Sequence, residues 1–182
     1  MKKTLLTVLL FLFTLTGSAQ FYAGGRLGWW RDGETHHKRF TIQPEVGYEW
    51  NECISFGALF GYYKDRSQFV KENPLPSDAN TITRSFELSP YVRYKVIKAG
   101  SVNLFIDGTV GFATSKTSSD ASRNSFRIGL RPGVSVALGK DFYAVAHAGF
   151  VGYADSDVGL YRNGIGFDIS GNELTFGMFY RF

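Results

Sequence analysis

The residues of this chain whose types could carry chemistry are few, because it has only three histidines and one cysteine. His36 and His37 are adjacent in a polar stretch, where histidines are more often solvated than bound to a metal. Nucleophilic catalysis needs a serine and a histidine within hydrogen-bond reach. His147 lies on the polar face of the predicted seventh strand, which favours a hydrogen-bonded interior side chain. We therefore predict no catalytic, cofactor-binding or metal site and no enzymatic activity.

Residues 1–19 have the pattern of a secretory signal. Two lysines precede an apolar run at 5–15, and small residues follow it up to Ala19. The run is too short to span a bilayer as a helix, which takes about 20 residues. We expect cleavage between Ala19 and Gln20, which leaves 20–182 as one mature domain.

The charge and cysteine content narrow the class of protein. The whole chain has 20 Lys+Arg and 16 Asp+Glu, and loss of Lys2 and Lys3 with the signal leaves 18 against 16. So small an excess argues against nucleic acid as a partner. Cys53 has no second cysteine with which to form an intrachain disulfide.

Period-2 alternation of apolar and polar residues recurs along the mature chain and predicts β-strands. Most of these segments have the nine to eleven residues or more that a tilted membrane strand requires. Their even number is typical of bacterial outer-membrane barrels. The predicted strands are 21–30, 40–50, 54–64, 82–96, 102–112, 125–138, 142–153 and 172–182.

Long and short connectors alternate strictly between these strands. Long polar stretches cover 31–39, 65–81, 113–124 and 154–171, whereas 51–53, 97–101 and 139–141 are short. A meander with long loops at one end and tight turns at the other is the pattern of an outer-membrane barrel.

One face of each predicted strand is apolar and the other is polar. Aromatic residues gather at both ends, with Trp29, Trp30, Tyr62, Tyr63 and Phe112 near the long connectors. The apolar face includes Phe142, Ala144, Ala146 and Phe150 in the seventh strand. The two aromatic belts indicate that the apolar face points outward to lipid. Glycine and serine crowd the polar face, which favours a narrow polar lumen. A soluble lipocalin-like barrel would reverse the two faces.

Three prolines share one register. Pro44, Pro90 and Pro132 each follow an apolar-x pair and precede x-Val in a strand that leads into a short turn. Proline cannot donate a hydrogen bond to the ladder, and a closed barrel has no free edge, so we expect bulges or kinks at these positions.

The repeated Pro-x-Val strands, the glycine-containing return strands and the ending "LTFGMFYRF" carry a resemblance. The chain is similar to the outer-membrane β-barrel domain family of Gram-negative bacteria, of the small OmpA/OmpX type. The resemblance implies an all-β, eight-stranded antiparallel up-and-down transmembrane barrel in the cell outer membrane, present as a monomer in contact with outer-membrane lipid and lipopolysaccharide. It also implies an assembly signal read by the barrel-assembly machinery, formed by Phe176, Met178, Tyr180 and Phe182.

Two eight-stranded families of this kind are enzymes, a lipid A deacylase and a lipid A palmitoyltransferase. The deacylase type places serine two residues after histidine, where this chain has Gly149, so that motif is absent. A lipid A-modifying barrel enzyme is a further alternative to the scaffold.

The predicted inward face bears six cations and five carboxylates, and eight strands enclose a lumen just wide enough to be filled by side chains. Near balance of charge favours a salt-bridged plug, and hence a closed structural or loop-presenting scaffold. A small porin-like channel and an accessory barrel of a secretion or assembly system remain alternatives. The predicted lumen network is Arg26, Glu45, Glu49, Glu87, Arg93, Lys95, Asp107, Arg127, Arg131, Glu173 and Arg181.

Overall fold

The computed structural model describes residues 20–31, 38–68, 80–117, 122–156, 160, 163–169 and 173–182. Within them there is no helix of the length and hydropathy that spanning a membrane requires. The predicted signal at 1–19 and the pair His36 and His37 lie outside the described residues, so signal cleavage stays a prediction. The described strands are β1 (Gln20–Arg31), β2 (Lys38–Glu49), β3 (Ile54–Gln68), β4 (Asn80–Ala99), β5 (Val102–Thr117), β6 (Arg123–Ala137), β7 (Phe142–His147), β8 (Phe150–Ser156), β9 (Gly164–Asp168) and β10 (Thr175–Arg181).

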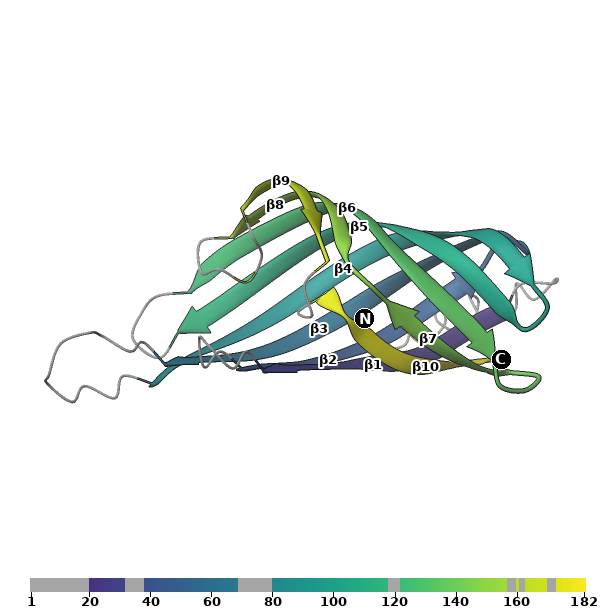
Figure 1. The fold of residues 1–182 in the computed structure, drawn as a ribbon, viewed down its shortest axis with the longest axis horizontal. Coiled ribbons are helices and arrows are strands. Elements are labelled where there is room, and N and C mark those ends of the chain that lie inside the picture. The colour runs from purple at the N-terminus through teal and green to yellow at the C-terminus, as the bar shows by residue number, and fades with distance from the viewer. Residues whose placement is uncertain are drawn as a thin grey trace, which may run out of the picture.

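The described strands close into a barrel. Each strand from β1 to β6 pairs antiparallel with the next, β7 pairs with β10, and β10 pairs with β1. At the seam the backbone N–H of Phe182 donates to the carbonyl of Phe21 over 2.8 Å. This ring confirms the predicted eight-stranded antiparallel barrel. Two further strands, β8 and β9, continue the seventh and eighth strands toward the end of the barrel that carries the long connectors (Figure 1).

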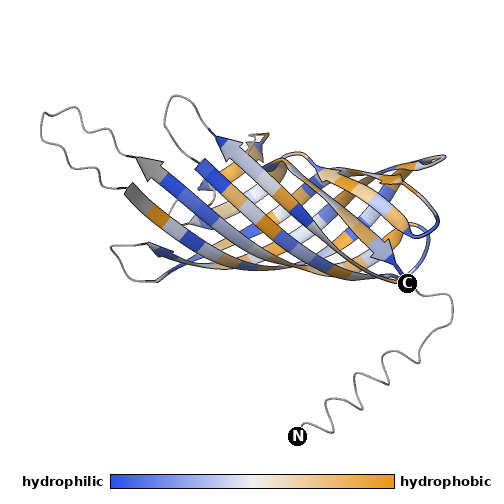
Figure 2. Ribbon diagram, turned by 90° about the horizontal axis from the view of Figure 1, so that it is seen from below, coloured by the Kyte–Doolittle hydropathy of each residue, from blue (hydrophilic) through white to orange (hydrophobic). Residues whose placement is uncertain are grey.

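The barrel has its apolar side chains outside and its charges inside. Figure 2 shows hydrophilic and hydrophobic residues alternating along the strands. Leu27, Val46 and Phe60 are exposed, whereas Arg26, Glu45 and Glu87 are buried. A hydrocarbon solvent favours this arrangement, and a closed ladder satisfies the backbone within it. The predicted assignment of the two faces is therefore confirmed in its main lines.

Three aromatic residues depart from that assignment, and one of them is Trp30, which was expected in the outer belt but lies opposite the buried Arg39 and so belongs to the inner face. Phe150 was expected on the outer face but is buried inside, because the predicted strand 142–153 is broken between β7 and β8. Gly133 of β6 pairs with His147, and Leu130 of β6 pairs with Val151. Three residues along β6 therefore correspond to four residues along β7 and β8. The extra residue is a bulge that reverses the alternation. Tyr63, expected in the outer belt, is also buried inside.

The prolines mark breaks in the ladders. Pro132 lies opposite the bulge between β7 and β8, as expected for a residue that cannot donate to the ladder. Pro44 and Pro90 fall where the β2–β3 and β4–β5 ladders skip two residues without changing register. The expected bulge is confirmed at Pro132, while at Pro44 and Pro90 the structure has only an interruption of the hydrogen bonding.

Several strands are longer than predicted at the end with long connectors. β3 continues to Gln68 and β5 to Thr117, into stretches that were expected to be loops. β9 lies within 154–171, where no strand was expected. The last strand begins at Thr175 instead of residue 172.

Candidate functional site

The charged side chains of the predicted lumen network form three connected groups inside the barrel, and the central one is built around Arg93. A further buried ion pair, which the sequence did not predict, joins Arg39 of β2 to Asp65 of β3 over 2.6 Å. From β4, Arg93 makes ion pairs with Glu45 of β2 at 3.0 Å and with Asp107 of β5 at 2.8 Å. Arg26 of β1 lies 3.0 Å from the other oxygen of Glu45. All four side chains are buried, so each charge depends on the others in place of water.

His147 completes this central group from β7. Its ring lies 2.8 Å from Oδ2 of Asp107 and 2.9 Å from Nη1 of Arg26, and its edge meets the ring of Phe105. A catalytic Asp–His pair needs a nucleophile beside it. The hydrogen bonds that the structure gives to the His147 side chain involve only Arg26 and Asp107, and the side chain is 0% exposed. The geometry is that of a charge-bridging interior residue.

A second group lies toward the long connectors. Arg127 of β6 makes two hydrogen bonds to Oε1 of Glu87, at 2.8 and 3.0 Å, and reaches Glu173 at 3.4 Å. Tyr63 and Ser89 donate to the same Glu87 carboxylate. Arg131 lies 3.8 Å from Glu173. This group spans the lumen from β4 to the start of β10.

A third, half-buried group lies at the end with short turns. Lys95 lies 2.8 Å and Arg181 3.5 Å from the carboxylate of Glu49. The three groups together contain all eleven residues of the predicted lumen network. The sequence indicated which side chains face inward, but it did not indicate which cation lies beside which carboxylate.

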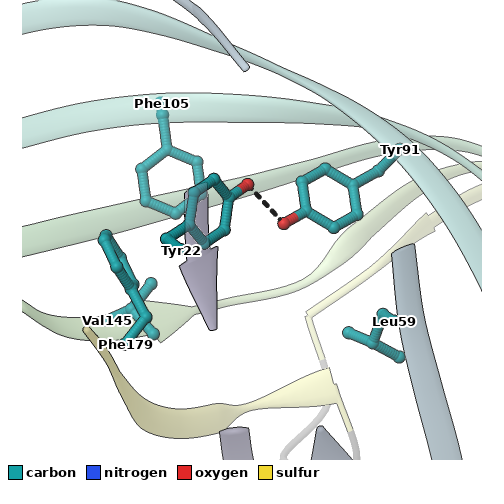
Figure 3. Packing of buried hydrophobic residues seen from close by; sticks show 6 residues of the cluster. All are labelled: Tyr22, Leu59, Tyr91, Phe105, Val145 and Phe179. Atoms are coloured by element: carbon teal, nitrogen blue, oxygen red, sulfur yellow. Dashed lines mark hydrogen bonds between the residues drawn. The ribbon is translucent and has the colours of Figure 1, made fainter. Parts of the chain in front are cut away.

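An apolar cluster fills the lumen beside the central group, and the sequence analysis missed it. Figure 3 shows its buried members, which come from six different strands: Tyr22, Leu59, Tyr91, Phe105, Val145 and Phe179. The hydroxyls of Tyr22 and Tyr91 lie 2.6 Å apart, and Tyr91 also donates to Glu45. The Arg93 guanidinium lies 4.2 Å from the centre of the Phe105 ring, a cation–π distance. Charges and aromatic rings therefore share one interior.

Two glycines make room for these rings. Gly47 lies directly opposite Tyr22 in the ladder, and Gly57 lies directly opposite Tyr91. A Cβ at either glycine would overlap the tyrosine ring. These tyrosine–glycine pairs were a possible signal, since Tyr22 and Tyr91 each have a glycine at the same level of a neighbouring strand.

The residues of the predicted assembly signal share the outer face of β10. Phe176, Met178, Tyr180 and Phe182 are all exposed, and Tyr180 contacts the rings of both Phe142 and Phe182. The described residues contain no group of three or more potential metal ligands. Cys53 is a free, partly buried thiol.

Comparison with known proteins agrees with this architecture. The family model of the outer membrane protein β-barrel domain matches residues 4–182. The neisserial surface protein A is similar with a TM-score of 0.54 and 16% identity, covering 91% of this chain and 98% of that one. A major outer membrane protein of Thermus thermophilus has a TM-score of 0.51 and 17% identity, covering 91% and 100%. No curated protein matches the chain significantly. At such identities the likeness concerns the fold alone.

Proposed function

This chain belongs to the outer membrane protein β-barrel domain family, and from that premise we propose that it is a closed scaffold of the outer membrane whose loops bind or shield. Its lumen is a structural plug and not a pathway for solutes. In this proposal the mature protein is a monomer that is exported through a cleaved signal and inserted by the barrel-assembly machinery. Its long connectors meet the lipopolysaccharide surface.

The observation that carries the closed lumen is the position of Arg93. It joins carboxylates from two other strands, and aromatic rings lie beside it. Moving so buried a charge aside to admit ions would leave Glu45 and Asp107 with less compensation, which is costly away from water. The Arg127–Glu87 group crosses the lumen at a second level. Two levels of paired charges favour a scaffold over a diffusion channel.

A small channel is the second candidate, because a charged lumen is also a feature of porins. Planar-bilayer recording of the refolded protein distinguishes the two. We expect no stable conductance from the unchanged protein or from Lys98→Ala, which alters an exposed pair outside the lumen. The double variant Arg93→Ala/Asp107→Ala removes one level of the plug and provides the comparison that is expected to raise the current. Large, stable conductance from the unchanged protein would overturn the closed scaffold.

The loop function needs its own variant. Because β3 continues to Gln68 and β4 begins at Asn80, residues 69–79 can be replaced by a short linker without cutting into the paired strands. Loss of binding to lipopolysaccharide vesicles, with heat-modifiable gel mobility retained, is the expected result. Unchanged binding and unchanged envelope integrity would contradict a role for this loop.

A further inference from the structure

The outer wall of the barrel concentrates positive charge at the end with long connectors. The carboxylates in the described parts of β1 to β5, such as Asp65 and Glu87, lie on the inner face. The cations at this end face outward, so the described outer wall of these strands carries positive and no negative side chains here. The exposed cations are Arg31, Lys38, Lys64, Arg66, Arg84 and Lys116.

Three of these cations form one row across adjacent strands. Arg84 of β4 lies directly opposite Lys64 of β3 and directly opposite Lys116 of β5. Like charges at such positions destabilise a sheet. Within the described residues, none of the three side chains has an ion pair or a hydrogen bond, whereas Lys98 at the opposite end lies 3.1 Å from the Glu52 carboxylate. The row therefore carries an unfavourable concentration of charge that a bound anion would relieve.

The row lies one outward position beyond the aromatic belt. Tyr62 is the outward residue next to Lys64, and Phe86 is the outward residue next to Arg84. The two rings lie 5.1 Å apart. Because an aromatic belt marks the boundary of the hydrocarbon region, the cations just beyond it lie at the level of the lipid phosphates.

A shallow hollow of about 710 Å³ adjoins the row on the outer wall. The hollow begins where the row ends, because Phe86, next to Arg84, is part of its lining. It lies on the hydrocarbon side of the row, so an acyl chain can occupy it while the head group of the same lipid reaches the cations. The outward apolar lining of the hollow is Phe86, Leu88, Phe112 and Phe126.

Polar side chains border the same hollow. Thr114 of β5 donates to Asn124 of β6 over 3.1 Å, and both residues are exposed. Asp155 of β8 also lines the hollow, at a distance of two strands from Lys116. A carboxylate accepts hydrogen bonds from hydroxyl groups but repels phosphate. The arrangement therefore fits a lipid whose head group combines a phosphate, for the row, with a sugar, for the polar border.

We propose that the row of Lys64, Arg84 and Lys116 binds a phosphate of lipid A, the phosphorylated sugar lipid of lipopolysaccharide, while one of its acyl chains lies in the hollow. Lysine and arginine donate charge-assisted hydrogen bonds to phosphate, and the bound phosphate offsets the repulsion within the row. The inference rests on the proposed outer-membrane location, and it assigns recognition of the lipid to the wall of the barrel and not to the loops.

The experiment titrates the refolded protein in detergent with lipid A and follows binding by native mass spectrometry. Lys64→Gln/Arg84→Gln removes two adjacent charges of the row and is expected to weaken binding of the first lipid A by about tenfold or more. Lys98→Gln/Lys140→Gln removes two exposed charges at the opposite end. This control has the same net charge and is expected to bind as the unchanged protein does. Equal binding by the two double variants would overturn the proposal.

Thermal unfolding distinguishes a binding role of the row from a structural one. Because the row brings like charges together, Lys64→Gln/Arg84→Gln should melt no lower than the unchanged protein when lipid A is absent. Lipid A is expected to raise the melting temperature of the unchanged protein more than that of the variant. A variant that melts lower without lipid A and gains the same rise from it would contradict the proposal. Heat-modifiable gel mobility shows that each variant is folded.

Two other lipids define the ligand. Dephosphorylated lipid A and phosphatidylglycerol are expected to bind the unchanged protein more weakly than lipid A, because the first lacks the phosphates and the second lacks the phosphorylated sugar. Binding of either as tight as that of lipid A would overturn the assignment.

The variant in which a short linker replaces 69–79 separates this proposal from the loop function. It is expected to bind lipid A as the unchanged protein does, because lipid A dispersed in detergent reaches the wall, whereas lipopolysaccharide vesicles present their saccharide surface to the loops. Loss of lipid A binding by this variant would contradict a site on the wall. A failed vesicle or conductance experiment leaves the lipid A result unaffected.

Discussion

Arg93 and Asp107 lie opposite one another in the β4–β5 ladder and form a two-point ion pair, with Nε–Oδ1 at 2.8 Å and Nη2–Oδ2 at 3.0 Å. The geometry matches a guanidinium to a carboxylate in one plane. Because Glu45 accepts from the same guanidinium, Arg93 is the residue on which two carboxylates depend. Glu45 alone has a second cation, Arg26, within 3.0 Å.

Removing Arg93 alone is therefore expected to destabilise the barrel more than removing the pair. Arg93→Leu leaves Asp107 without its guanidinium partner and should cost about 3–5 kcal/mol in the free energy of unfolding. In Arg93→Leu/Asp107→Leu the remaining Glu45 still has Arg26, so the loss should be smaller. Denaturant unfolding in lipid vesicles, followed by tryptophan fluorescence, measures both. A double variant less stable than the single one would contradict the argument.

The exposed pair Lys98–Glu52 provides the control for that comparison. Its two side chains are separated by 3.1 Å but reach solvent. Since solvent-exposed pairs contribute about 0–1 kcal/mol, Lys98→Ala should leave the unfolding midpoint almost unchanged.

The tyrosine–glycine pairs predict a second stability effect. A methyl group at Gly57 would overlap the Tyr91 ring, which is held by Glu45 and the neighbouring apolar cluster. Gly57→Ala is expected to destabilise the barrel by about 1–3 kcal/mol. Gly25→Ala is the matched control, because its nearest atoms would be 3.8 Å from the added carbon. Thermal unfolding in detergent should separate the two variants, and equal melting temperatures would show that Tyr91 moves aside at no cost.

Deletion of Phe182 is expected to lower the yield of folded barrel more than Trp30→Ala does. Phe182 closes the β1–β10 seam through its backbone N–H and carries the last aromatic ring of the predicted assembly signal. Trp29→Ala is a control of matched exposure, since Trp29 and Phe182 are 73% and 72% exposed. Folded protein in isolated outer membranes is quantified by gel mobility with and without boiling. Phe182→Ala retains the backbone, so a loss with this variant would assign the effect to the ring. Equal yields for all variants would make Phe182 an ordinary belt residue.

The sequence predicted the barrel and its inward charges because both follow from period-2 alternation, which is local. Arg26, Glu45 and Arg93 could be assigned to the inner face one strand at a time. Their pairing depends on the tilt of strands far apart in the chain, and no local pattern contains that information. Tyr22 and Tyr91 were missed for a related reason, because inward aromatics between outward apolar residues merge into one apolar run.

Phe150 shows where alternation itself fails. The pattern reads continuously across Ala148 and Gly149, and nothing in the spacing of apolar residues marks an added residue. The available signal was Gly149, because a glycine within a strand often marks a bulge. It lies at the level where Pro132 interrupts the neighbouring strand. The same unmarked change of register separates β9 from β10, since His147 pairs with Thr175 whereas Phe150 pairs with Asp168.

Gly149 turns the chain between β7 and β8, and its contribution to the free energy of unfolding can be measured. Its φ of 81° lies in the left-handed region, and an added Cβ would come within 2.9 Å of the carbonyl oxygen of Asp168 on β9. Gly149→Ala should therefore cost about 1–3 kcal/mol through backbone strain, and it should also loosen the β8–β9 hairpin. Gly166→Ala on the same hairpin meets no heavy atom within 4 Å and is the control. Denaturant unfolding gives the global cost, and hydrogen exchange of the β8 and β9 amides gives the local one. Unchanged exchange in β9 with a lowered global stability would show that Gly149 holds the seventh strand but not the hairpin.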